Sequence, residues 1–402
     1  MAATEPGQAG ILAGIRVVDL SRTFAGPLCA MILAELGAEV IKVEDPGGGD
    51  ETRTWPPQID GQSGYYHALN RSKRGITANF KHPDGLRIVH DLIARSDVVV
   101  ENFTPGVADR LGLGYAQLRA LNPRLIYCSI SGFGQTGPYR TRKGYDPILQ
   151  AMGGLMSVTG EKGGGPLKTM LPVADTSTGV FACLGILGAL FARERGGGGQ
   201  YLDMAMLDVM VTMLTTVGTA FLYTGAVPQR AGTENPARVP SAAYLCRDGE
   251  FVQLVPNQRQ WPLFCAIIGL PALADDPRFD TNLRRIEHQD ALQPLLRDRL
   301  RERDSTEWLD LFLEHGIPSG PIYTLDRLFA DPQVAAREMV GGFDHPLLGA
   351  MPAINLPFKF SATPVGITSP PPLYGEHTED ILKGDLGYSA EEVARLRREG
   401  AI

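Results

Sequence analysis

Short hydrophobic runs alternate with amphipathic segments along the first half of the chain. Residues 15–44 follow the order strand, glycine-containing turn, helix, strand, which is the order of a βαβ unit. An amphipathic helix is predicted at 84–94, and strands are predicted at 97–102 and 124–130. Strands that are hydrophobic on both faces are typical of a parallel sheet covered by helices on both sides. We therefore predict a doubly wound α/β sheet over residues 11–205.

The pattern changes beyond this sheet. Residues 224–244 are rich in glycine, proline and polar residues, which predicts a linker or a loop. Residues 244–255 are typical of a β-hairpin that turns at Asp248-Gly249, and helical periodicity then continues to about Glu314. We predict that residues 224–330 form the linker and a smaller α+β domain.

Two segments are strongly apolar. Val180 to Ala192 is too short to span a bilayer, and Met206 to Tyr223 contains Asp208 and four threonines. Both are therefore predicted to be buried helices, and no membrane partner is expected. The first ten residues have neither the apolar core of a signal peptide nor the arginine-rich character of a transit peptide, so we expect a cytoplasmic location.

Composition narrows the class of protein. The 402 residues include 38 Lys+Arg and 45 Asp+Glu, which gives a net charge of −7, and 44% are hydrophobic. Scattered basic residues argue against a nucleic-acid partner, which needs a concentrated basic face. The five cysteines show no CxxC pair and the seven histidines show no HxH or HExxH spacing, so we expect neither a disulfide framework nor a metal site.

A GxGxxG pattern occupies Gly132–Gly137 directly after a predicted strand. This is the usual place of a dinucleotide fingerprint. However, residues 138–143 contain proline, tyrosine and three basic residues instead of an apolar helix, and no acidic residue ends a second strand roughly 20 residues later. The pattern favours a glycine turn shaped for another ligand or for packing, and dinucleotide binding is the alternative.

The loop 21–27 joins the first predicted strand to the first predicted helix. Open α/β sheets bind phosphorylated ligands at this position, on the N-terminus of the helix. The alternative is an ordinary turn with Pro27 in the first helical position. Seven basic residues are candidates for phosphate contacts, although each is also a plausible surface charge: Arg22, Lys42, Arg71, Lys73, Arg74, Lys81 and Arg110.

Asp175 immediately precedes the apolar helix that includes Val180 to Ala192. It is predicted to be the N-cap of that helix, where its carboxylate would accept hydrogen bonds from first-turn amides. A carboxylate in this position is expected to stay ionised, and the free amides could also stabilise an oxyanion. Structural and catalytic roles both remain open at this point.

Seven blocks of the chain are similar to those of the family III CoA-transferases, in the same order and with the same spacing. They are residues 12–53, 70–85, 97–115, 121–138, 173–179, 316–334 and 375–382. Within that family the chain most resembles the succinate–hydroxymethylglutarate type, which uses dicarboxylic acyl groups. The segments that carry this closer resemblance are GDETRTW (49–55), SGYYHALNRSKR (63–74), YCSISGFGQTGP (127–138) and SPPPLYGEHT (369–378).

The resemblance implies an architecture as well as an activity. It implies a homodimer of two interlocked, ring-like subunits. Each subunit would contain a Rossmann-like large domain, built from both chain ends, with the smaller α+β domain inserted. Residues 1–223 would then be the first part of the large domain, and residues 331–402 would be the return segment that completes it.

The resemblance also assigns site residues by position. The catalytic nucleophile of the family corresponds to Asp175, and Tyr65 corresponds to a tyrosine near the reacting groups. The family's CoA-contacting positions correspond to Phe24, Ala25, Ala78, Asn79, Lys81, Asn102, Phe103 and Arg110.

Two further sets of contacts are expected from chemistry. Backbone amides near Gly134 and Gly137, and those at 176–178, are candidates for binding the oxyanion and the CoA thioester. A dicarboxylic substrate needs a cation for its distal carboxylate, and Arg53 and Lys168 are the candidates.

The implied mechanism uses the Asp175 carboxylate as a covalent carrier. Its attack on a donor thioester would give an aspartyl anhydride and CoA thiolate, and the thiolate would then attack the aspartyl carbonyl to give an aspartyl-CoA thioester. The CoA thioester would thus be a substrate, and no permanently bound cofactor is expected. An acyl-CoA racemase or an intramolecular CoA-transferase on the same fold is the alternative, although the histidine of the racemases is replaced here by Tyr145.

Overall fold

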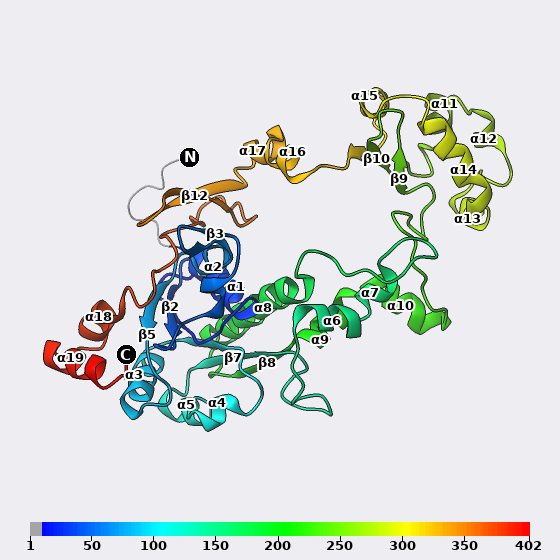
Figure 1. Ribbon diagram of the computed structural model, residues 1–402. Helices are drawn as coiled ribbons and strands as arrows, with labels where there is room; N and C mark the ends of the chain where they lie inside the picture. The colour runs from blue at the N-terminus through cyan, green and yellow to red at the C-terminus, as the bar shows by residue number, and fades with distance from the viewer. Residues whose placement is uncertain (1–9) are drawn as a thin grey trace. The chain divides into compact units, whose positions relative to one another are not determined.

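The computed structural model describes residues 10–402, and the prediction for the first ten residues therefore falls almost wholly outside the described part (Figure 1). The chain divides into two compact units. The first contains Met1–Leu155, Lys168–Thr224 and Gln333–Ile402, and the second contains Met156–Leu167 and Gly225–Pro332. The chain passes between the units at four points, and two of these, at 224/225 and 332/333, lie within two residues of the predicted boundaries at 223/224 and 330/331.

Residues 156–167 belong to the second unit, although no local sequence pattern indicated it. The side chain of Arg230 holds this segment, because its guanidinium donates to the carbonyl oxygens of Gly164 and Ser157. The amide of Gly232 also donates to the carbonyl oxygen of Gly160 at 2.9 Å. These contacts join residues that are distant in the sequence, so only the folded chain reveals them.

A six-stranded parallel sheet forms the centre of the first unit. Its spatial order is β5-β2-β1-β6-β7-β8, which is 3-2-1-4-5-6 when only these strands are numbered along the chain. This is the doubly wound order, in which the two halves of the sheet diverge between β1 and β6. The strands are β1 (Arg16–Asp19), β2 (Glu39–Glu44), β5 (Arg74–Thr77), β6 (Val98–Glu101), β7 (Ile126–Ser131) and β8 (Tyr201–Ala205). The predicted parallel α/β sheet is confirmed.

Alternating side chains on the strands divide the core of this unit into two clusters. Val17 and Val18 are neighbours in β1 but point to opposite faces, so Val18 joins the cluster under α3 and α5, and Val17 joins the cluster under α1 and α8. The covering helices are α1 (Ala25–Glu35), α3 (Pro83–Ala94), α5 (Tyr115–Leu121) and α8 (Val173–Glu194).

The C-terminal segment packs on the same unit as the N-terminal strands. Val393 and Leu396 of α19 (Ala390–Arg398) are buried in the cluster that contains Val18. The amide of Thr77 in β5 donates to Thr378 Oγ1 at 3.1 Å. Figure 1 shows the red C-terminal helices beside the blue and cyan elements of the sheet.

Shorter elements complete the first unit. They are β3 (Gln58–Ile59), β4 (Gln62–Ser63), α2 (Gly64–Asn70), α4 (Val107–Arg110), α6 (Asp146–Met152), β12 (Val340–His345), β13 (Gly349–Ile354) and α18 (Thr378–Asp380), with a 3-10 turn at Glu51–Thr54 and a π-turn at Ile381–Asp385. Three short helices lie at the crossings between the units: α7 (Leu155–Val158), α16 (Leu325–Phe329) and α17 (Pro332–Ala336).

The second unit is a small α+β body. The predicted hairpin is confirmed, because β9 and β10 pair antiparallel with Phe251 opposite Leu245, and Gly249 in the turn has φ +84°. Its core includes Trp261, Phe264 and Trp308. The elements are β9 (Ala242–Leu245), β10 (Phe251–Leu254), β11 (Ser319–Pro321), α11 (Trp261–Ile267), α12 (Ala272–Asp275), α13 (Asn282–Glu287), α14 (Gln289–Leu300) and α15 (Ser305–Glu314).

Both apolar segments were predicted to be buried helices, but the first is buried on one side only and the second is only partly buried. The first lies in α8, which is long and apolar enough to cross a membrane by length and composition, but one side of it packs on α1. The second is not one buried helix. It forms α9 (Met206–Met213) and α10 (Thr215–Thr224), bent by 75°, and no residue of α10 is buried in this chain. An apolar sequence predicts that a helix will be covered, but it does not show whether the same chain covers it.

Two buried ion pairs lie beneath the loop between β1 and α1. Lys73 Nζ donates to Asp19 Oδ2 at 2.8 Å and to the carbonyl oxygen of Pro27 at 2.9 Å. Lys42 Nζ donates to Asp50 Oδ2 at 3.0 Å and to the carbonyl oxygen of Ser21 at 2.9 Å. All four charged side chains have no exposed surface.

These pairs correct part of the predicted set of phosphate contacts. Lys42 and Lys73 are buried and paired with carboxylates, so they are structural ions in this chain. Arg71 is likewise paired with Glu35, and Arg74 is paired with Glu39 and Asp385. Four of the basic residues that were candidates for phosphate contacts therefore form ion pairs within the fold.

Replacing Lys73 by methionine should strongly destabilise the protein. Lys73→Met leaves the Asp19 carboxylate buried without its partner, which typically costs about 3–5 kcal/mol and should lower the melting temperature by about 5–10 °C. Lys162→Met is the matched control, because Lys162 forms an exposed pair with Asp290 that should be worth about 1 kcal/mol or less. Equal shifts for the two variants in thermal unfolding would contradict the assignment.

Candidate active site

Asp175 lies in the first turn of α8, as its third residue. The N-cap is Pro172 and not Asp175, so the predicted capping role is wrong. The cap comes instead from Asp146 at the start of α6, whose Oδ1 accepts from the amides of Ala174 at 2.8 Å and Asp175 at 3.3 Å. Asp146 Oδ2 accepts from Gln150 Nε2 at 2.6 Å, which fixes the carboxylate. A side chain from another helix thus satisfies the first amides of α8.

The charge state of Asp175 also differs from its prediction. Burial, and then the negative charge of Asp146, raise the pKa of Asp175 to about 7. The sequence predicted an ionised carboxylate stabilised by free amides. Those amides already donate to Asp146, so the stabilising interaction is absent and a like charge replaces it. Asp175 therefore gains a proton far more readily than an ordinary aspartate does.

Asp146 was not among the residues predicted from the sequence. An acidic residue followed by proline at the start of a helical pattern, as in Asp146-Pro147, is a signal for a helix start and not for a partner of Asp175. Just before Asp146, the chain after β7 folds back so that Gly144 contacts Gly132. A Cβ atom on Gly144 would lie 2.5 Å from Gly132 Cα, so larger residues would separate the two strands of this loop.

Tyr65 of α2 lies close to Asp175. Burial and the charges of Asp175 and Asp146 raise the pKa of Tyr65, so the phenol stays protonated. Its ring packs edge-on against Phe24, with centroids 5.9 Å apart, and against Trp55, with centroids 5.0 Å apart. The structure thus brings together the two predicted residues Tyr65 and Asp175, with Phe24 beside them.

The starts of α1 and α8 touch at Gly179. A Cβ atom there would lie 2.8 Å from the carbonyl oxygen of Ala25, so only glycine allows this approach. Helix α1 starts at Ala25, so Pro27 is its third residue and not its first. Helices that connect parallel strands start at the carboxyl edge of the sheet. Asp175 therefore lies at that edge, next to the loop between β1 and α1.

Most positions that the resemblance assigned to CoA lie at the same carboxyl edge. Ala78, Asn79 and Lys81 follow β5, and Asn102 and Phe103 follow β6. Phe24 and Ala25 start α1, and Arg110 is exposed at the end of α4. Their contacts with CoA stay predictions.

The GxGxxG segment follows β7, the fifth strand of the parallel sheet, whereas a dinucleotide fingerprint follows the first. Gly134 and Gly137 both have φ +84°, as expected for glycine turns. The Gly134 amide donates to Ser131 Oγ at 3.0 Å, and the Gln135 amide donates to Asp203 at 3.0 and 3.2 Å. These two amides are therefore occupied within the chain, which argues against the predicted oxyanion site here.

The predicted oxyanion contact at the helix start meets the same difficulty. The amide of Thr176 donates to the carbonyl oxygen of Pro172 at 2.8 Å. The side-chain hydroxyl of Thr178 is occupied as well, because its Oγ1 donates to the carbonyl oxygen of Ala174 at 2.6 Å. The protonated phenol of Tyr65 is another candidate donor, because it is near enough for the charge of Asp175 to raise its pKa and its ring is ordered by aromatic contacts.

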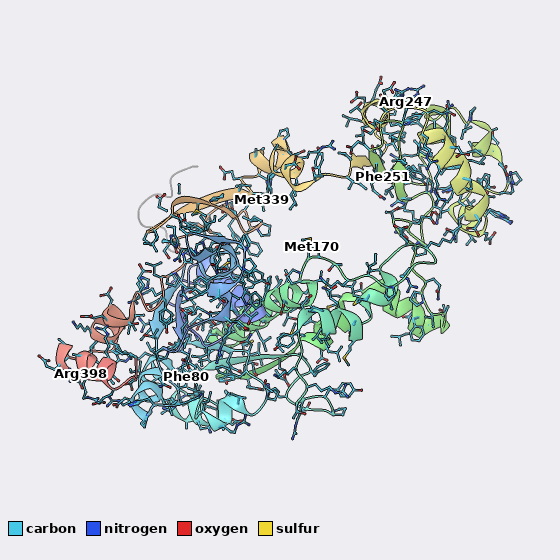
Figure 2. The ribbon with its side chains drawn as sticks, in the orientation of Figure 1. Phe80, Met170, Arg247, Phe251, Met339 and Arg398 are labelled. Atoms are coloured by element: carbon cyan, nitrogen blue, oxygen red, sulfur yellow. The ribbon has the colours of Figure 1, made fainter. Side chains whose placement is uncertain are left out.

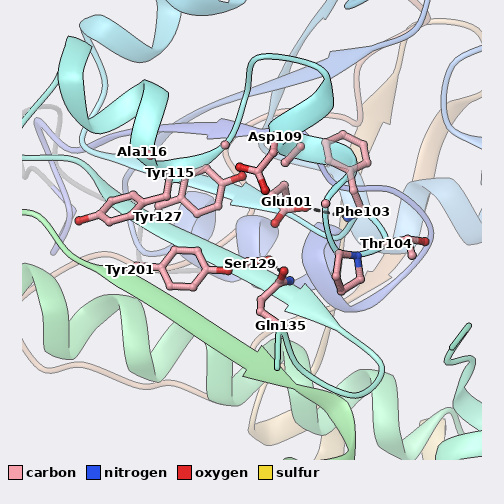
Figure 3. Close-up of a pocket in the computed structure, with 14 residues that line it drawn as sticks. Glu101, Phe103, Thr104, Asp109, Tyr115, Ala116, Tyr127, Ser129, Gln135 and Tyr201 are labelled. Carbon is pink, nitrogen blue, oxygen red and sulfur yellow. Dashed lines mark hydrogen bonds between the residues drawn. The ribbon is translucent and has the colours of Figure 1, made fainter. Parts of the chain in front are cut away.

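A cavity of about 260 Å³ opens beside β6 and β7 (Figure 3). Its lining includes Glu101, Asp109 and three tyrosines, but no lysine, arginine or histidine. Burial raises the pKa of Glu101 to about 7. This acidic lining does not suit the phosphates of CoA. A smaller pocket beside β1 and β2, lined by Ser21, Arg22, Lys42, Asp50 and Phe80 among others, adjoins the β1–α1 loop.

Comparisons with known proteins bear on this site. The model of CoA-transferase family III matches residues 12–378. The chain belongs to this family. An acyl-CoA transferase of Fusarium pseudograminearum is 43% identical over 98% of this chain and 88% of its own. A succinyl-CoA:glutarate CoA-transferase of Mus musculus is 40% identical over 97% of this chain and 90% of its own.

A solved structure shares the fold. It is a CAIB/BAIF family protein from Brucella suis, 40% identical, with a TM-score of 0.83 over 93% of this chain and 99% of that one. The predicted membership of CoA-transferase family III, and with it the prediction of an enzyme, is confirmed.

The two cations predicted for a substrate carboxylate have other partners in this CoA-transferase. Arg53 forms a two-point pair with Glu44, at 2.8 and 2.7 Å, and donates to the Tyr66 hydroxyl. Its guanidinium is therefore a structural group. Lys168 is exposed, and its Nζ donates to the carbonyl oxygen of Thr169 at 3.0 Å. A substrate role for either residue stays a prediction that no contact in the described chain supports.

The described chain contains no cluster of metal-ligating side chains. Within residues 10–402, no group of three or more histidine, cysteine, aspartate or glutamate side chains could hold a metal ion. A CoA thioester as substrate agrees with membership of the CoA-transferase family, whereas the expectation that no other cofactor is bound stays an expectation.

The shifted pKa of Asp175 predicts a specific pH dependence. A nucleophilic carboxylate must be ionised, so kcat/KM for acyl-CoA should fall about tenfold per pH unit below pH 7. Asp146→Asn removes the like charge, which lowers the pKa of Asp175 and should shift this fall to lower pH. The amide oxygen of the substituted side chain can still accept from the helix start. The exposed Asp275→Asn is the control. An unchanged profile in Asp146→Asn would rule out this coupling.

Proposed function

We propose that this protein transfers CoA from succinyl-CoA to a second dicarboxylic acid through Asp175. The observation that carries the proposal is a half-buried carboxylate at the start of α8, next to Tyr65 and the β1–α1 loop, in a chain of CoA-transferase family III. The mouse relative named succinyl-CoA:glutarate CoA-transferase covers nearly the whole chain and supports dicarboxylic substrates.

The proposed reaction has two symmetrical halves. Asp175 attacks the thioester carbonyl carbon, the C–S bond breaks, and an aspartyl anhydride and CoA thiolate form. The thiolate attacks the aspartyl carbonyl, which gives aspartyl-CoA thioester and releases the donor acid. The acceptor acid then reverses these steps. The thioester bond is conserved throughout, so no external energy source is consumed.

The surroundings of Asp175 suit these steps. The Tyr65 phenol remains protonated and can donate to the oxygen that becomes negative during attack. Asp146 fixes the first turn of α8, so the carboxylate keeps its position at the sheet edge. Burial makes the charged carboxylate less stable in the free protein, which favours its conversion into a neutral acyl group.

Asp175→Ala tests the function directly. With succinyl-CoA and a panel of unlabelled mono- and dicarboxylic acids, mass spectrometry should detect new CoA esters for the wild type. Loss of the nucleophile should lower this exchange by at least about 10³-fold. Asp275→Ala, which replaces an exposed aspartate in the second unit, should keep full activity.

Two outcomes would contradict the proposal. One is exchange at the wild-type rate by folded Asp175→Ala. The other is an absence of CoA exchange together with uptake of solvent deuterium into a 2-methylacyl-CoA, which would favour the racemase alternative.

We also propose that the active enzyme is the interlocked homodimer that the family resemblance implies. The observation that supports this proposal is apolar surface that a single chain leaves uncovered. Met170, just before α8, is 96% exposed (Figure 2), and Leu222 on α10 is 79% exposed. A second copy of the chain would cover these apolar side chains.

A charge on this surface should weaken the dimer. Leu222→Glu places a carboxylate where the second copy is expected to pack, so the dimer fraction should fall in light scattering coupled to size-exclusion chromatography. Leu313→Glu is the matched control, because Leu313 is also 79% exposed but lies on α15 of the second unit. The proposal fails if both variants remain as dimeric as the wild type, or if the wild type is a monomer.

The reducing cytoplasm is the proposed location. All five cysteines are buried and free, which suits a compartment where thiols stay reduced.

A further inference from the structure

Side chains from β1, from β2 and from the segment after β2 hold the loop between β1 and α1. The Ser21 amide donates to Asp19 Oδ1 at 3.0 Å, and the Ser21 carbonyl oxygen accepts from Lys42. The Thr23 amide donates to both oxygens of Asp50, at 3.3 and 3.2 Å. Thr23 has φ +71°, a left-handed conformation that a β-branched residue rarely adopts. Contacts from outside the loop must therefore maintain this conformation.

Asn102 holds the same loop from the β6 side. Its Oδ1 accepts from the Arg22 amide at 2.9 Å, and its Nδ2 donates to the Arg22 carbonyl oxygen at 2.7 Å. The side chain of Asn102 therefore pairs with both polar backbone groups of one residue. This two-point contact bridges the position where the two halves of the sheet diverge, because Arg22 follows β1 and Asn102 follows β6.

The neighbours of Asn102 hold it in place. Glu101 Oε2 accepts from the Phe103 amide at 2.7 Å, which is the dashed line in Figure 3. The Arg22 guanidinium lies over the Phe103 ring, 5.6 Å from its centroid. The turn after β6 and the loop after β1 are thus joined through backbone and side chain.

The loop that these contacts hold is connected to the proposed reacting groups through Phe24. Phe24 follows Thr23 and packs on Tyr65, whose pKa is raised by burial and by the charge of Asp175. A change in the backbone at Arg22 would therefore move the loop at the start of α1 and the aromatic contact next to the nucleophile.

We propose that Asn102 is a positioning residue for acyl-CoA binding. Its amide holds Arg22, and so keeps the β1–α1 loop in its binding conformation before the substrate arrives. This differs from the role implied by the family resemblance, in which position 102 contacts CoA. It rests on the proposed function, because the loop is taken as part of the CoA site. Preforming a loop lowers the entropy cost of binding.

Asn102→Ala removes both contacts to Arg22. The β1–α1 loop should then loosen in the ligand-free protein, so the amides of Arg22, Thr23 and Phe24 should exchange with deuterium at least about tenfold faster. Saturating CoA should restore much of the protection. The Kd for CoA and the KM for acyl-CoA should rise about tenfold, while kcat changes less than about threefold.

Asn122→Ala is the matched control. Asn122 also uses its side-chain amide on backbone groups, donating to the Ser96 carbonyl oxygen at 2.7 Å and accepting from the Arg124 amide at 3.1 Å. It lies before β7, at the opposite edge of the sheet. Its replacement should lower stability comparably without changing exchange at 22–24 or the KM.

A second variant separates the two hydrogen bonds between the Asn102 side chain and the Arg22 backbone. Asn102→Asp keeps an acceptor for the Arg22 amide but loses the donor to its carbonyl oxygen. It should give an exchange rate between those of the wild type and Asn102→Ala.

The outcomes distinguish this proposal from others. If CoA affinity falls in Asn102→Ala while exchange at 22–24 stays at the wild-type rate, Asn102 is a direct ligand and the proposal is wrong. If neither changes relative to Asn122→Ala, the proposal is also wrong. Faster exchange in Asn102→Ala together with no measurable CoA binding by the wild type would instead overturn the proposed function. It would still show that Asn102 holds the β1–α1 loop.

Discussion

The β1–α1 loop depends on two lysines and two aspartates that are removed from solvent. Burial of an ion costs several kcal/mol unless a partner and further hydrogen bonds compensate it. Asp19 and Lys73 compensate each other's buried charge, and Lys42 and Asp50 do the same. Burial alone would raise the pKa of Asp50, but Lys42 and the hydrogen bonds of Thr52 lower it to about 2, so the carboxylate stays charged. The whole first half of the sheet must form before these charges can pair.

This network also explains how a rigid scaffold supports a transfer reaction. The same four side chains bind Ser21, Thr23 and Pro27 of the loop, so the sheet and the start of α1 are fixed together. The close contact between Gly179 and Ala25 then places the start of α8 against the start of α1. Asp175 is consequently held by backbone packing and by the Asp146 cap.

The covalent role proposed for Asp175 agrees with an environment that does not stabilise its charge. A carboxylate with free helix amides would be strongly stabilised as an anion and would be a weaker nucleophile. Asp146 occupies the amides of Ala174 and Asp175 and adds a like charge. The protein thereby uses one aspartate to cap the helix and to raise the pKa of another, and the second keeps its side chain available for reaction.

Local sequence patterns determined the parallel strands, the Asp248-Gly249 hairpin and the positions that resemble CoA-transferase family III, because these depend on hydrophobic alternation, turn residues and short motifs. Tertiary structure decided the ion pairs of Lys42 with Asp50 and of Lys73 with Asp19. It also decided the cap from Asp146, the exposed face of α10 and the two hydrogen bonds from Asn102 to Arg22. Most of these join residues that are far apart along the chain, the Lys42–Asp50 pair depends on burial under the loop, and the exposure of α10 depends on which surface another part of the protein covers. A basic or apolar residue has the same local pattern in either case, so only the folded chain shows which partner it has.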